Sequence, residues 1–453
     1  MSEWKKVKIG DFLHQYRNTI YVEDAEIYRQ ITISSKDGIK YRCSKIGKEI
    51  GRKRQFVIDL KKNPNTVIFT RQGLHEGSIG IAPFEVDECI TTENMPMFSI
   101  DESMVLSDYL RLFFKSPIFI NLIGTLTPTG SAQKAIHERD LLPLEILLPD
   151  LSTQKAIVEN LSHQLKKSEN LQQEIEKQKS YTKQLRQNIL QDAIEGRLTE
   201  EWRKNNPVVK GNPDFDAEAL FEKIQEEKSH TDSILLTQNQ EKKKKGKSLD
   251  FPNPCGNTEK PFEIPEGWKW VRLGEVINLL SGRDFEPSEY NDKQIGVPYI
   301  TGASNFCETG IIINRWTENP KCIARHGDLL LVCKGSGYGT ISYADFEMAH
   351  IARQIMSITS CSEYILIKGI EYILKAKFDY IKSQGKGLIP GIDRNTILNI
   401  KIGIPPLAEQ TEIVRVVEAQ LAKVDQLEKQ ITERETMTKQ LMQSIMKDAF
   451  REE

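Results

Sequence analysis

The sequence lacks the features that mark several common classes of protein. Its seven cysteines are odd in number and form no C-x-x-C pair, which argues against both a disulfide framework and a zinc ribbon. No run of about 18 apolar residues is present, so no membrane-spanning helix is predicted. The opening residues, Met1-Ser2-Glu3-Trp4-Lys5-Lys6, contain no apolar segment of the kind found in secretory signals. We therefore expect a cytoplasmic protein with reduced cysteines.

Catalytic and nucleotide-binding motifs are also missing. There is no G-x-x-x-x-G-K-[ST] phosphate loop and no H-E-x-x-H, and the seven histidines are scattered. The segment Gly335-Ser336-Gly337-Tyr338-Gly339 resembles a dinucleotide fingerprint, but it leads into a predicted strand instead of a helix, so we interpret it as a tight hairpin. The segment Ile404-Pro405-Pro406-Leu407 does not match the Asn/Asp-Pro-Pro-aromatic loop of adenine methyltransferases. We expect a non-catalytic chain with no cofactor or metal of its own.

The chain also lacks a basic excess, because its formal net charge is -2 over 453 residues. A lone DNA-binding domain is usually basic. If this chain binds DNA, its cations must act locally, or partner subunits must supply part of the phosphate contacts.

What the sequence does contain is a two-fold internal repeat. Trp4–Asp11 resembles Trp268–Glu275 at an offset of 264, and the more loosely matched Thr66–Arg71 lies over Leu329–Lys334 at an offset of 263. The strongest match has no gap and places residues 149–193 over residues 405–449 at an offset of 256. Its identical pairs include Leu151/Leu407, Gln154/Gln410, Thr182/Thr438, Leu185/Leu441 and Ile189/Ile445. So many identities without a gap indicate a true repeat.

The repeated segment has the pattern of a long coiled-coil helix. Residues 152–195 contain no proline or glycine, Ser152 is a candidate N-cap, and Gly196 stands where a C-cap is expected. A helix of about 44 residues is roughly 65 Å long. Steps of four and three residues define a heptad seam at Leu171, Ile175, Gln178, Thr182, Leu185 and Ile189, which returns at Leu427, Ile431, Arg434, Thr438, Leu441 and Ile445. Polar residues occupy the same two seam positions in both copies. We predict that the two helices pair with each other as an antiparallel coiled coil, which should bring the chain ends close together. The alternative is that each helix pairs with a different protein.

The segments before each helix predict two similar α+β (α/β-like) domains at residues 1–150 and 266–405. In the first, strands are predicted at Thr66–Arg71 and Ser78–Ala82, and a helix at Asp108–Leu122 that Pro117 should interrupt. The second repeats this order with Asp328–Cys333, Thr340–Tyr343 and Ile370–Ile381. The domain boundaries are therefore 1–150, the helix 151–195, a linker at 196–265, the second domain 266–405 and the helix 406–450.

The linker at residues 196–265 has no counterpart in the other half. Helical spacing within it covers Asp216–Glu227, and a basic run follows at Lys242–Lys247. Runs of like charge are usually solvated. We interpret the segment as a solvated linker with a short helix, and a supplementary phosphate contact from the basic run is the alternative.

Polar and basic side chains on predicted loops are the remaining candidates for chemistry. Arginine can bind O6 and N7 of guanine together, glutamine can bind N6 and N7 of adenine, and lysine, serine and glycine amides suit phosphates. Loops of this composition occur in both halves, which is why we interpret them as DNA-binding. The candidate DNA-binding residues are Arg52, Arg54, Arg71, Gln72, Gln133 and Lys134 in the first half, and Arg283, Lys334, Ser336, Arg353, Gln354 and Lys386 in the second.

Taken together, these motifs resemble the specificity subunits of type I restriction-modification systems. The resemblance depends on two domains that share a predicted fold but differ in sequence, and that alternate with two similar helices, each opening with Leu-x-x-Gln after a proline. The residues that carry it are Ile404 to Gln410, the weaker copy Leu148 to Gln154, the segment Glu195 to Arg203, and the Pro-Glu-Gly-Trp start at Pro265 to Trp268.

The resemblance implies a function. Each domain would be a target-recognition domain for one half of a split, asymmetric site in double-stranded DNA, and the helices would set the spacer between the half-sites. Two methyltransferase subunits would dock on the helices and bring S-adenosylmethionine, and they would methylate adenine with base flipping. Restriction subunits would add ATP- and Mg-dependent translocation and cleavage. Two other interpretations fit the sequence: the recognition subunit of a type II system with fused cleavage and methylation, and a coiled-coil scaffold that binds proteins.

Overall fold

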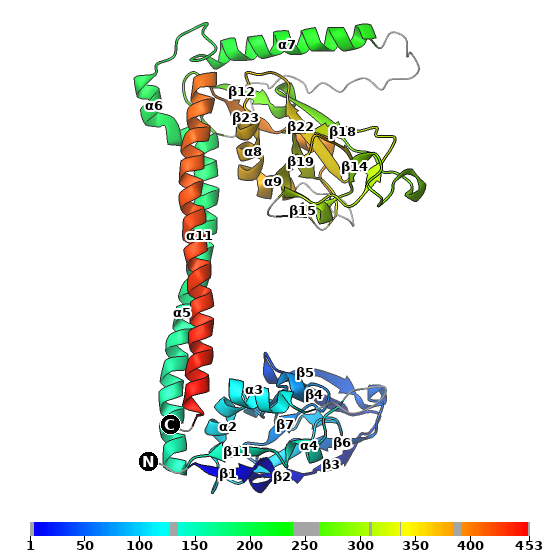
Figure 1. The fold of residues 1–453 in the computed structure, drawn as a ribbon, viewed down its shortest axis with the longest axis vertical. Coiled ribbons are helices and arrows are strands. Elements are labelled where there is room, and N and C mark those ends of the chain that lie inside the picture. Colours follow the sequence, from blue (N-terminus) through cyan, green and yellow to red (C-terminus); the bar gives the residue numbers. More distant parts are fainter. Residues whose placement is uncertain are drawn as a thin grey trace. The chain divides into compact units, whose positions relative to one another are not determined.

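The computed structural model describes residues 4–126, 135–238, 262–307, 310–335, 337–383 and 391–451. The chain folds as two compact units (Figure 1). Unit 1 comprises residues 1–178 and 430–453, and unit 2 comprises residues 179–429. Each unit contains one α+β domain and part of both long helices, so each is described by itself.

Unit 1 contains a two-stranded, a four-stranded and a five-stranded sheet. The two-stranded sheet pairs β1 (Lys5–Lys8) with β11 (Glu145–Leu148). The four-stranded sheet has the order β2 (Leu13–Tyr16), β10 (Met97–Ile100), β7 (Val67–Phe69) and β8 (Ile79–Ile81). The five-stranded sheet has the order β3 (Thr19–Tyr21), β6 (Arg54–Val57), β9 (Ile90–Thr91), β4 (Ile27–Ser34) and β5 (Gly38–Ile46). Its α-helices are α1 (Ile9–Phe12), α2 (Ser107–Phe113), α3 (Pro117–Gly124) and α4 (Glu138–Leu141).

Unit 2 repeats the first two sheets and replaces the third. Here β12 (Lys269–Arg272) pairs with β23 (Lys401–Ile404). The four-stranded sheet has the equivalent order β13 (Ile277–Ser281), β22 (Ile355–Ser360), β19 (Leu329–Val332) and β20 (Ile341–Tyr343). The other strands are β17 (Trp316–Thr317), β14 (Val297–Ile300), β21 (Met348–Ile351) and β18 (Ile323–Arg325) in one sheet, and β15 (Phe306–Cys307) and β16 (Gly310–Ile311) in another. Its helices include α8 (Ile367–Ala376), α9 (Phe378–Ser383) and α10 (Arg394–Leu398).

The strand register corrects one of the sequence alignments. Val67 pairs with Ile81 in unit 1, and Leu329 pairs with Tyr343 in unit 2, so this part of the repeat has an offset of 262. The expected offset of 263 was wrong by one residue. The error arose because both strands are uniformly apolar and buried on both faces, which leaves no alternation to fix the register. As a result, Lys334 is equivalent to Gln72 and not to Arg71.

The predicted helix at 108–122 is interrupted as expected. Helix α2 ends at Phe113, and α3 starts at Pro117 with Ser116 as its N-cap, whose hydroxyl accepts a hydrogen bond from the Phe119 amide at 3.1 Å. Proline suits the first turn of a helix because its missing N–H has no partner there anyway. The predicted hairpin around Gly335 to Gly339 is also confirmed, since it joins the antiparallel strands β19 and β20.

The long helices are α5 (Leu151–Ile194) and α11 (Leu407–Ala449), and they pair antiparallel as predicted (Figure 1). In unit 1, Leu161 near the start of α5 shares a buried cluster with Met446 near the end of α11. In unit 2, Ile189 near the end of α5 shares a cluster with Val417 near the start of α11. Phe450, which follows α11, packs edge-on against Tyr109 in the core of unit 1, so both described ends of the chain belong to that unit.

The predicted seam consists of two columns, each made of positions seven residues apart, and mainly one of the two columns is buried. Ile175, Thr182 and Ile189 are buried, at intervals of seven residues, as are Ile431 and Thr438 in the second copy. The other predicted column is partly wrong, because the side chains of Leu185, Leu427 and Leu441 are exposed. A two-helix pair buries a narrow stripe, and the side chains at the edge of that stripe face solvent.

The prediction is confirmed for the C-terminal cap of α5 but not for its N-terminal cap. Gly196 adopts the left-handed conformation with φ of +75°, as expected for a helix C-cap. Ser152, however, is not the N-cap. The carboxylate of Asp150 accepts hydrogen bonds from the Thr153 amide at 2.8 Å and from the Ser152 hydroxyl at 2.6 Å, so Asp150 caps the helix.

The segment after α5 is not simply a solvated linker. It forms α6 (Glu200–Asn205) and α7 (Ala217–Gln238), which is longer than the helix predicted at 216–227. Leu220 and Ile224 are fully buried in the core of unit 2. The basic run at residues 242–247 lies outside the described residues.

A buried carboxylate joins this segment to α11. Glu409 accepts hydrogen bonds from Thr199 and Arg203 at 2.6 Å each, and from the Trp268 indole at 2.8 Å. Its side chain is only 2% exposed, so these donors provide the pairing that a buried charge requires. The contact ties the Glu195–Arg203 segment to the start of the second helix.

Candidate nucleic-acid interface

The four-stranded sheet of unit 2 gathers the predicted residues at one edge. Strands β13 and β19 both run antiparallel to β22, so their ends meet the start of β22. Backbone hydrogen bonds hold the three loops together: the Cys333 amide donates to the Gln354 carbonyl at 2.7 Å, and the Arg283 amide donates to the Ile351 carbonyl at 2.9 Å. The structure therefore brings Arg283, Lys334, Arg353 and Gln354 together, although they are far apart in the sequence.

These four residues differ in how their side chains are held. Arg353 is paired with Asp284, with 2.6 Å between Nε and Oδ2. The exposed side chains of Arg283 and Lys334 make no ion pair with another described residue. Gln354 lies against Gly302, where a Cβ atom would come within 2.5 Å of its Oε1. Among the described residues, this edge thus offers two cations without an ion-pair partner and an exposed amide group.

A buried histidine supports the loop of Arg283. His350 is fully buried, with 4.0 Å between the centroids of its ring and that of Phe285. Its Nδ1 accepts a hydrogen bond from the Cys322 amide at 3.1 Å, so its Nε2 carries the proton that is donated to the Arg283 carbonyl at 2.8 Å. Burial lowers the pKa of His350 below its ordinary value, which keeps the ring neutral.

The same edge in unit 1 contains a paired arginine. The Arg71 amide donates to the Asn94 carbonyl at 3.0 Å, which matches the bond between Cys333 and Gln354. The Arg71 guanidinium makes a bidentate interaction with the Glu138 carboxylate: Nε donates to Oε2 at 3.0 Å, and Nη2 donates to Oε1 at 2.6 Å. Burial raises the pKa of Glu138, but the hydrogen bonds from Arg71, from its own backbone amide and from Gln15, together with the charge of Arg71, outweigh burial and lower the pKa below its ordinary value. Arg71 is therefore held in place by an ionised partner.

Other predicted DNA-binding residues of unit 1 lie near the pocket beside Arg71 and Glu138. A polar pocket of about 170 Å³ is lined by Arg71, Glu138 and Glu93, among others. The carboxylate of Glu93 lies 3.5 Å from Arg52 and 3.8 Å from Arg54, both of which are largely exposed. Exposed pairs of this kind are weak and exchange readily with other anions. Gln72 follows Arg71 in the turn after β7 and is engaged within the protein.

Four predicted residues lie outside the described residues, namely Gln133, Lys134, Ser336 and Lys386. The DNA-binding role of the whole set stays a prediction. In the described ranges, no group of three or more His, Cys, Asp or Glu side chains is arranged to hold a metal ion, and no helix is long and apolar enough to cross a membrane.

Sequence reasoning missed two exposed cations on β5. Arg42 and Lys45 are exposed and make no ion pair with another described residue. The signal that could have found them is the run Lys40-Tyr41-Arg42, in which β5 places cations next to an exposed aromatic ring.

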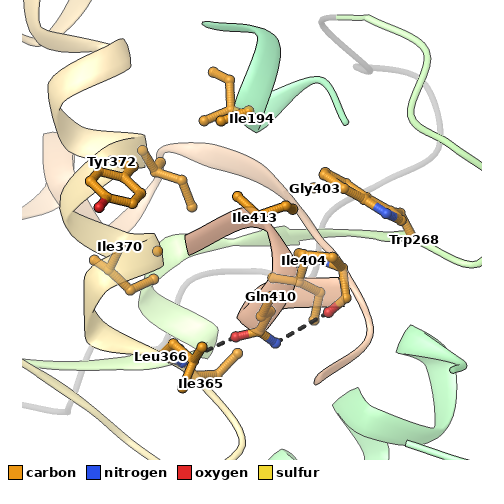
Figure 2. A pocket seen from close by; sticks show the side chains of 14 residues that line it. Ile194, Trp268, Ile365, Leu366, Ile370, Tyr372, Gly403, Ile404, Gln410 and Ile413 are labelled. Atoms are coloured by element: carbon orange, nitrogen blue, oxygen red, sulfur yellow. Dashed lines mark hydrogen bonds between the residues drawn. The ribbon is translucent and has the colours of Figure 1, made fainter. Parts of the chain in front are cut away.

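The repeated glutamine of the Leu-x-x-Gln motif has the same role in both units. In unit 1, Oε1 of Gln154 accepts from the Leu106 amide at 2.8 Å, and its Nε2 donates to the carbonyls of Met104 at 3.0 Å and Pro149 at 2.8 Å. In unit 2, Gln410 makes the same set of bonds: to Leu366 at 3.1 Å, which Figure 2 shows, and to Tyr364 and Pro405 at 3.2 Å each. We call each set of three bonds the glutamine clamp. It joins the start of each long helix to the loop before α2 or α8.

The pocket beside Gln410 has no chemistry of its own. Its walls are mainly apolar and include Ile194, Trp268, Ile370 and Ile413 (Figure 2). Its volume of about 50 Å³ suits little more than a water molecule. We interpret it as a small packing gap where the helices meet the domain.

The fold and this edge define a class of protein. Proteins of this class have two α+β domains with equivalent frameworks and different polar loops. A glutamine clamp joins each domain to the start of one of two antiparallel helices. The model of the type I restriction modification DNA specificity domain matches residues 1–178 and 265–434, which is most of the chain. The chain belongs to this family.

Individual relatives are distant. The EcoDI specificity subunit of Escherichia coli is 26% identical over 336 residues, which cover 72% of this chain and 65% of the relative. The EcoKI specificity subunit of Escherichia coli K12 is 24% identical, covering 78% of this chain and 66% of the relative. The MjaVIII specificity subunit of Methanocaldococcus jannaschii is 28% identical over 158 residues, covering 34% of this chain and 36% of the relative. The matched part thus spans from about a third to about two thirds of these curated relatives.

Two solved structures share the fold over nearly the whole chain. One comes from a study of complex assembly and conformational transition of the type I R-M system, with a TM-score of 0.70, 19% identity and coverage of 99% of this chain and 97% of that one. The other is the HsdS subunit from Thermoanaerobacter tengcongensis, with a TM-score of 0.53, 19% identity and coverage of 99% and 96%. They confirm the predicted α+β fold with long helices.

Proposed function

We propose that this chain is the DNA-recognition subunit of a type I restriction-modification complex. It would act in the cytoplasm and would itself catalyse no reaction. Its two α+β domains would each recognise one half of a split, asymmetric site in double-stranded DNA. The antiparallel helices would set the spacer between the two half-sites.

One observation carries this proposal. The two units keep the same order in their two-stranded and four-stranded sheets, one equivalent loop-joining hydrogen bond and the same glutamine clamp, but they carry different side chains at the equivalent edge. The equivalent pairs are Arg71/Cys333, Gln72/Lys334 and Asn94/Gln354. Two domains that recognise different DNA sequences would need such a constant framework with variable polar loops. Different side chains at equivalent positions also account for an asymmetric site.

The partners follow from the same proposal. Two methyltransferase subunits would bind the helices and supply S-adenosylmethionine, and restriction subunits would supply the ATP- and Mg-dependent steps. Support comes from exposed apolar side chains on the helices. Tyr181 and Leu185 are 64% and 43% exposed, and their counterparts one repeat later, Met437 and Leu441, are 64% and 60% exposed. Residues four apart lie on one helix face, so the chain offers the same apolar pair twice, as two copies of one partner would need.

The test is to express the chain with its methyltransferase partner in a host that lacks adenine methylation, and then to sequence the methylome. We expect a bipartite, asymmetric motif with a fixed spacer, and a shift of the motif when residues 266–405 are exchanged for those of a relative. A contiguous motif, or methylation without sequence preference, would contradict the proposal. Protein binding without any methylated motif would favour the scaffold interpretation instead.

A further inference from the structure

The two units differ at the outer face of their two-stranded sheets. In unit 2, α7 covers this face next to β12 (Figure 1). Its Leu220 and Ile224 are fully buried in a cluster that also contains Val271. In unit 1, no described helix covers the equivalent strands β1 and β11. A groove of about 580 Å³ lies there instead, and it is lined by Lys5, Val7, Ser103, Met104, Leu148, Pro149, Asp150, Leu151 and Ser152.

The groove of unit 1 corresponds residue by residue to the surface that α7 covers. Lys5 pairs with Leu148 in β1 and β11, just as Lys269 pairs with Ile404 in β12 and β23. Met104 and Tyr364 each accept the same bond of the glutamine clamp. Leu151 and Leu407 are the first residues of the two long helices. The equivalent pairs are therefore Lys5/Lys269, Val7/Val271, Met104/Tyr364, Leu148/Ile404 and Leu151/Leu407.

Covering by α7 changes the exposure of these residues. Val271 is 1% exposed in unit 2, whereas Val7 is only partly buried. Leu151 is 38% exposed, whereas Leu407 packs against the core of unit 2. Val7 and Leu151 are therefore more exposed in unit 1 than their counterparts beside α7, whereas Leu148 is buried, as Ile404 is in unit 2. Exposed apolar surface of this kind favours binding.

The charge at the groove also matches a helix like α7. In unit 2, Lys269 forms an ion pair with Glu218 in the first turn of α7 and lies 5.1 Å from the ring centroid of Phe221. Lys5 occupies the same register position in unit 1. A ligand with an acidic residue in its first turn and an apolar stripe like that of Ala217, Leu220, Phe221 and Ile224 would complement both the floor and the cation.

One difference limits how the ligand would bind. In unit 2, the amides of Leu407 and Ala408 donate to the carbonyls of Pro213 and Asp214, so the segment before α7 caps α11. In unit 1, Asp150 caps α5 with its own side chain. The helix start needs no external cap there, so only the apolar stripe and the acidic residue of a ligand would be required.

We propose that the groove of unit 1 binds an α7-like amphipathic helix supplied by a partner subunit of the complex. The α7 of a second copy is a poor ligand, because its apolar stripe belongs to the core of its own unit and would have to be withdrawn from it. That the partner is a subunit of a restriction-modification complex rests on the proposed function. That the groove accepts such a helix does not.

The first experiment measures the groove directly. A fluorescently labelled peptide with the sequence of residues 212–229 is titrated into the full chain, and binding is followed by anisotropy. We expect saturable binding that weakens at least about tenfold in Leu151→Glu, because a buried apolar contact is lost. Leu147→Glu is the matched control, since Leu147 is 42% exposed on β11 but does not line the groove. Equal binding to both variants would overturn the proposal.

A charge exchange checks the orientation of the peptide. Lys5→Glu should weaken binding by about two- to fivefold, as is usual for an exposed ion pair. A peptide carrying Glu218→Lys should recover that loss on Lys5→Glu and bind the unchanged protein more weakly. Absence of this recovery would overturn the predicted register of the helix.

The second experiment identifies the natural ligand. A photoreactive amino acid replaces Met104 in the assembled complex, and the crosslinked peptide is identified by mass spectrometry. We expect a crosslink to the apolar stripe of a helix in a partner subunit. A crosslink to α7 of a second copy, or none in a complex that still methylates its motif, would overturn the inference while leaving the proposed function intact. Failure to methylate any bipartite motif would instead count against the proposed function.

Discussion

Arg434 donates a hydrogen bond to Oε1 of Gln178 at 3.2 Å, and the two residues are separated by 256 positions, which is the offset of the repeated helices. They are thus the same position in the two copies. When two equivalent helices pair antiparallel, equivalent residues can meet only at the centre of the pair. Gln178 and Arg434 were both predicted as polar seam residues, and their contact fixes the register of one helix against the other.

This central contact leads to a prediction for the spacer. Seven residues inserted into both helices, after Gln178 and after Arg434, preserve the seven-residue interval of the buried column and lengthen each helix by about 10 Å. At about 3.4 Å per base pair, the spacer of the methylated motif should grow by about three base pairs, with both half-sites unchanged. Methylome sequencing measures this. An altered half-site sequence with an unchanged spacer would contradict the role of the helices.

The same insertion in only one helix is the control. It shifts one copy against the other, so we expect an unstable helix pair instead of a new, well-defined spacer.

The glutamine clamp predicts a large effect from one buried side chain. Gln154→Leu leaves the Leu106 amide and the carbonyls of Met104 and Pro149 without their partner. We expect the free energy of unfolding of unit 1 to fall by about 3 kcal/mol. Hydrogen exchange at the Leu106 amide should accelerate in parallel. Gln173→Leu, at an exposed position of the same helix, should change neither quantity. Equal effects of the two variants would argue against the clamp.

His350 predicts a pH dependence for unit 2. Its pKa in the folded protein lies below the ordinary value of 6.5, so the unfolded chain binds a proton first as the pH falls. The stability contributed by the neutral ring is therefore complete above pH 6.5 and declines as the pH falls below it. Thermal unfolding between about pH 7 and about pH 5 should show this decline.

Two histidine variants separate this effect from other titrations. His350→Gln should remove most of the pH dependence of unit 2, whereas His326→Gln should retain it, because His326 is exposed. A retained decline in His350→Gln would show that another group is responsible.

The sheet edges predict separable effects on specificity. Lys334→Ala removes from unit 2 an exposed cation that has no ion-pair partner in the described part of the chain, and we expect discrimination at one position of its half-site to fall by about tenfold or more. Arg71→Ala should relax only the other half-site, and it should also destabilise unit 1, because Glu138 loses its partner. Selection from randomised duplexes with the methyltransferase present measures both. A loss that is uniform across sequences would identify a phosphate contact instead.

The exposed apolar pairs on the helices predict stepwise loss of partner subunits. Leu185→Glu should release one of the two methyltransferase subunits, Leu441→Glu should release the other, and the double variant should release both. Native mass spectrometry gives the stoichiometry directly. Thr182→Glu is a contrasting variant: Thr182 is buried in the helix pair, so its replacement should unfold the pair. An unchanged stoichiometry in the double variant would contradict docking at these residues.

The candidate site was predicted in part. Arg283, Lys334, Arg353 and Gln354 were chosen as polar residues on separate loops, and the structure places them at one edge of one sheet. Sequence could not show this, because the edge is created by the antiparallel pairing of β13 and β19 with β22. Nor could it show that Glu138, 67 positions away from Arg71, would bind its guanidinium.

The sequence by itself determined the repeat, the two long helices and the break between α2 and α3 at Pro117. These features follow from local patterns: seven-residue periodicity, the absence of proline and glycine, and the fixed backbone angle of proline.

Only the tertiary structure decided which apolar residues are buried. Leu185 and Ile189 fit the same heptad pattern, yet only Ile189 is buried, because a partner helix covers a narrow stripe. Leu151 and Leu407 open the same motif, yet α7 covers only the surface around Leu407. Burial depends on what packs against a residue from elsewhere in the chain, and periodicity within one segment carries no information about that neighbour.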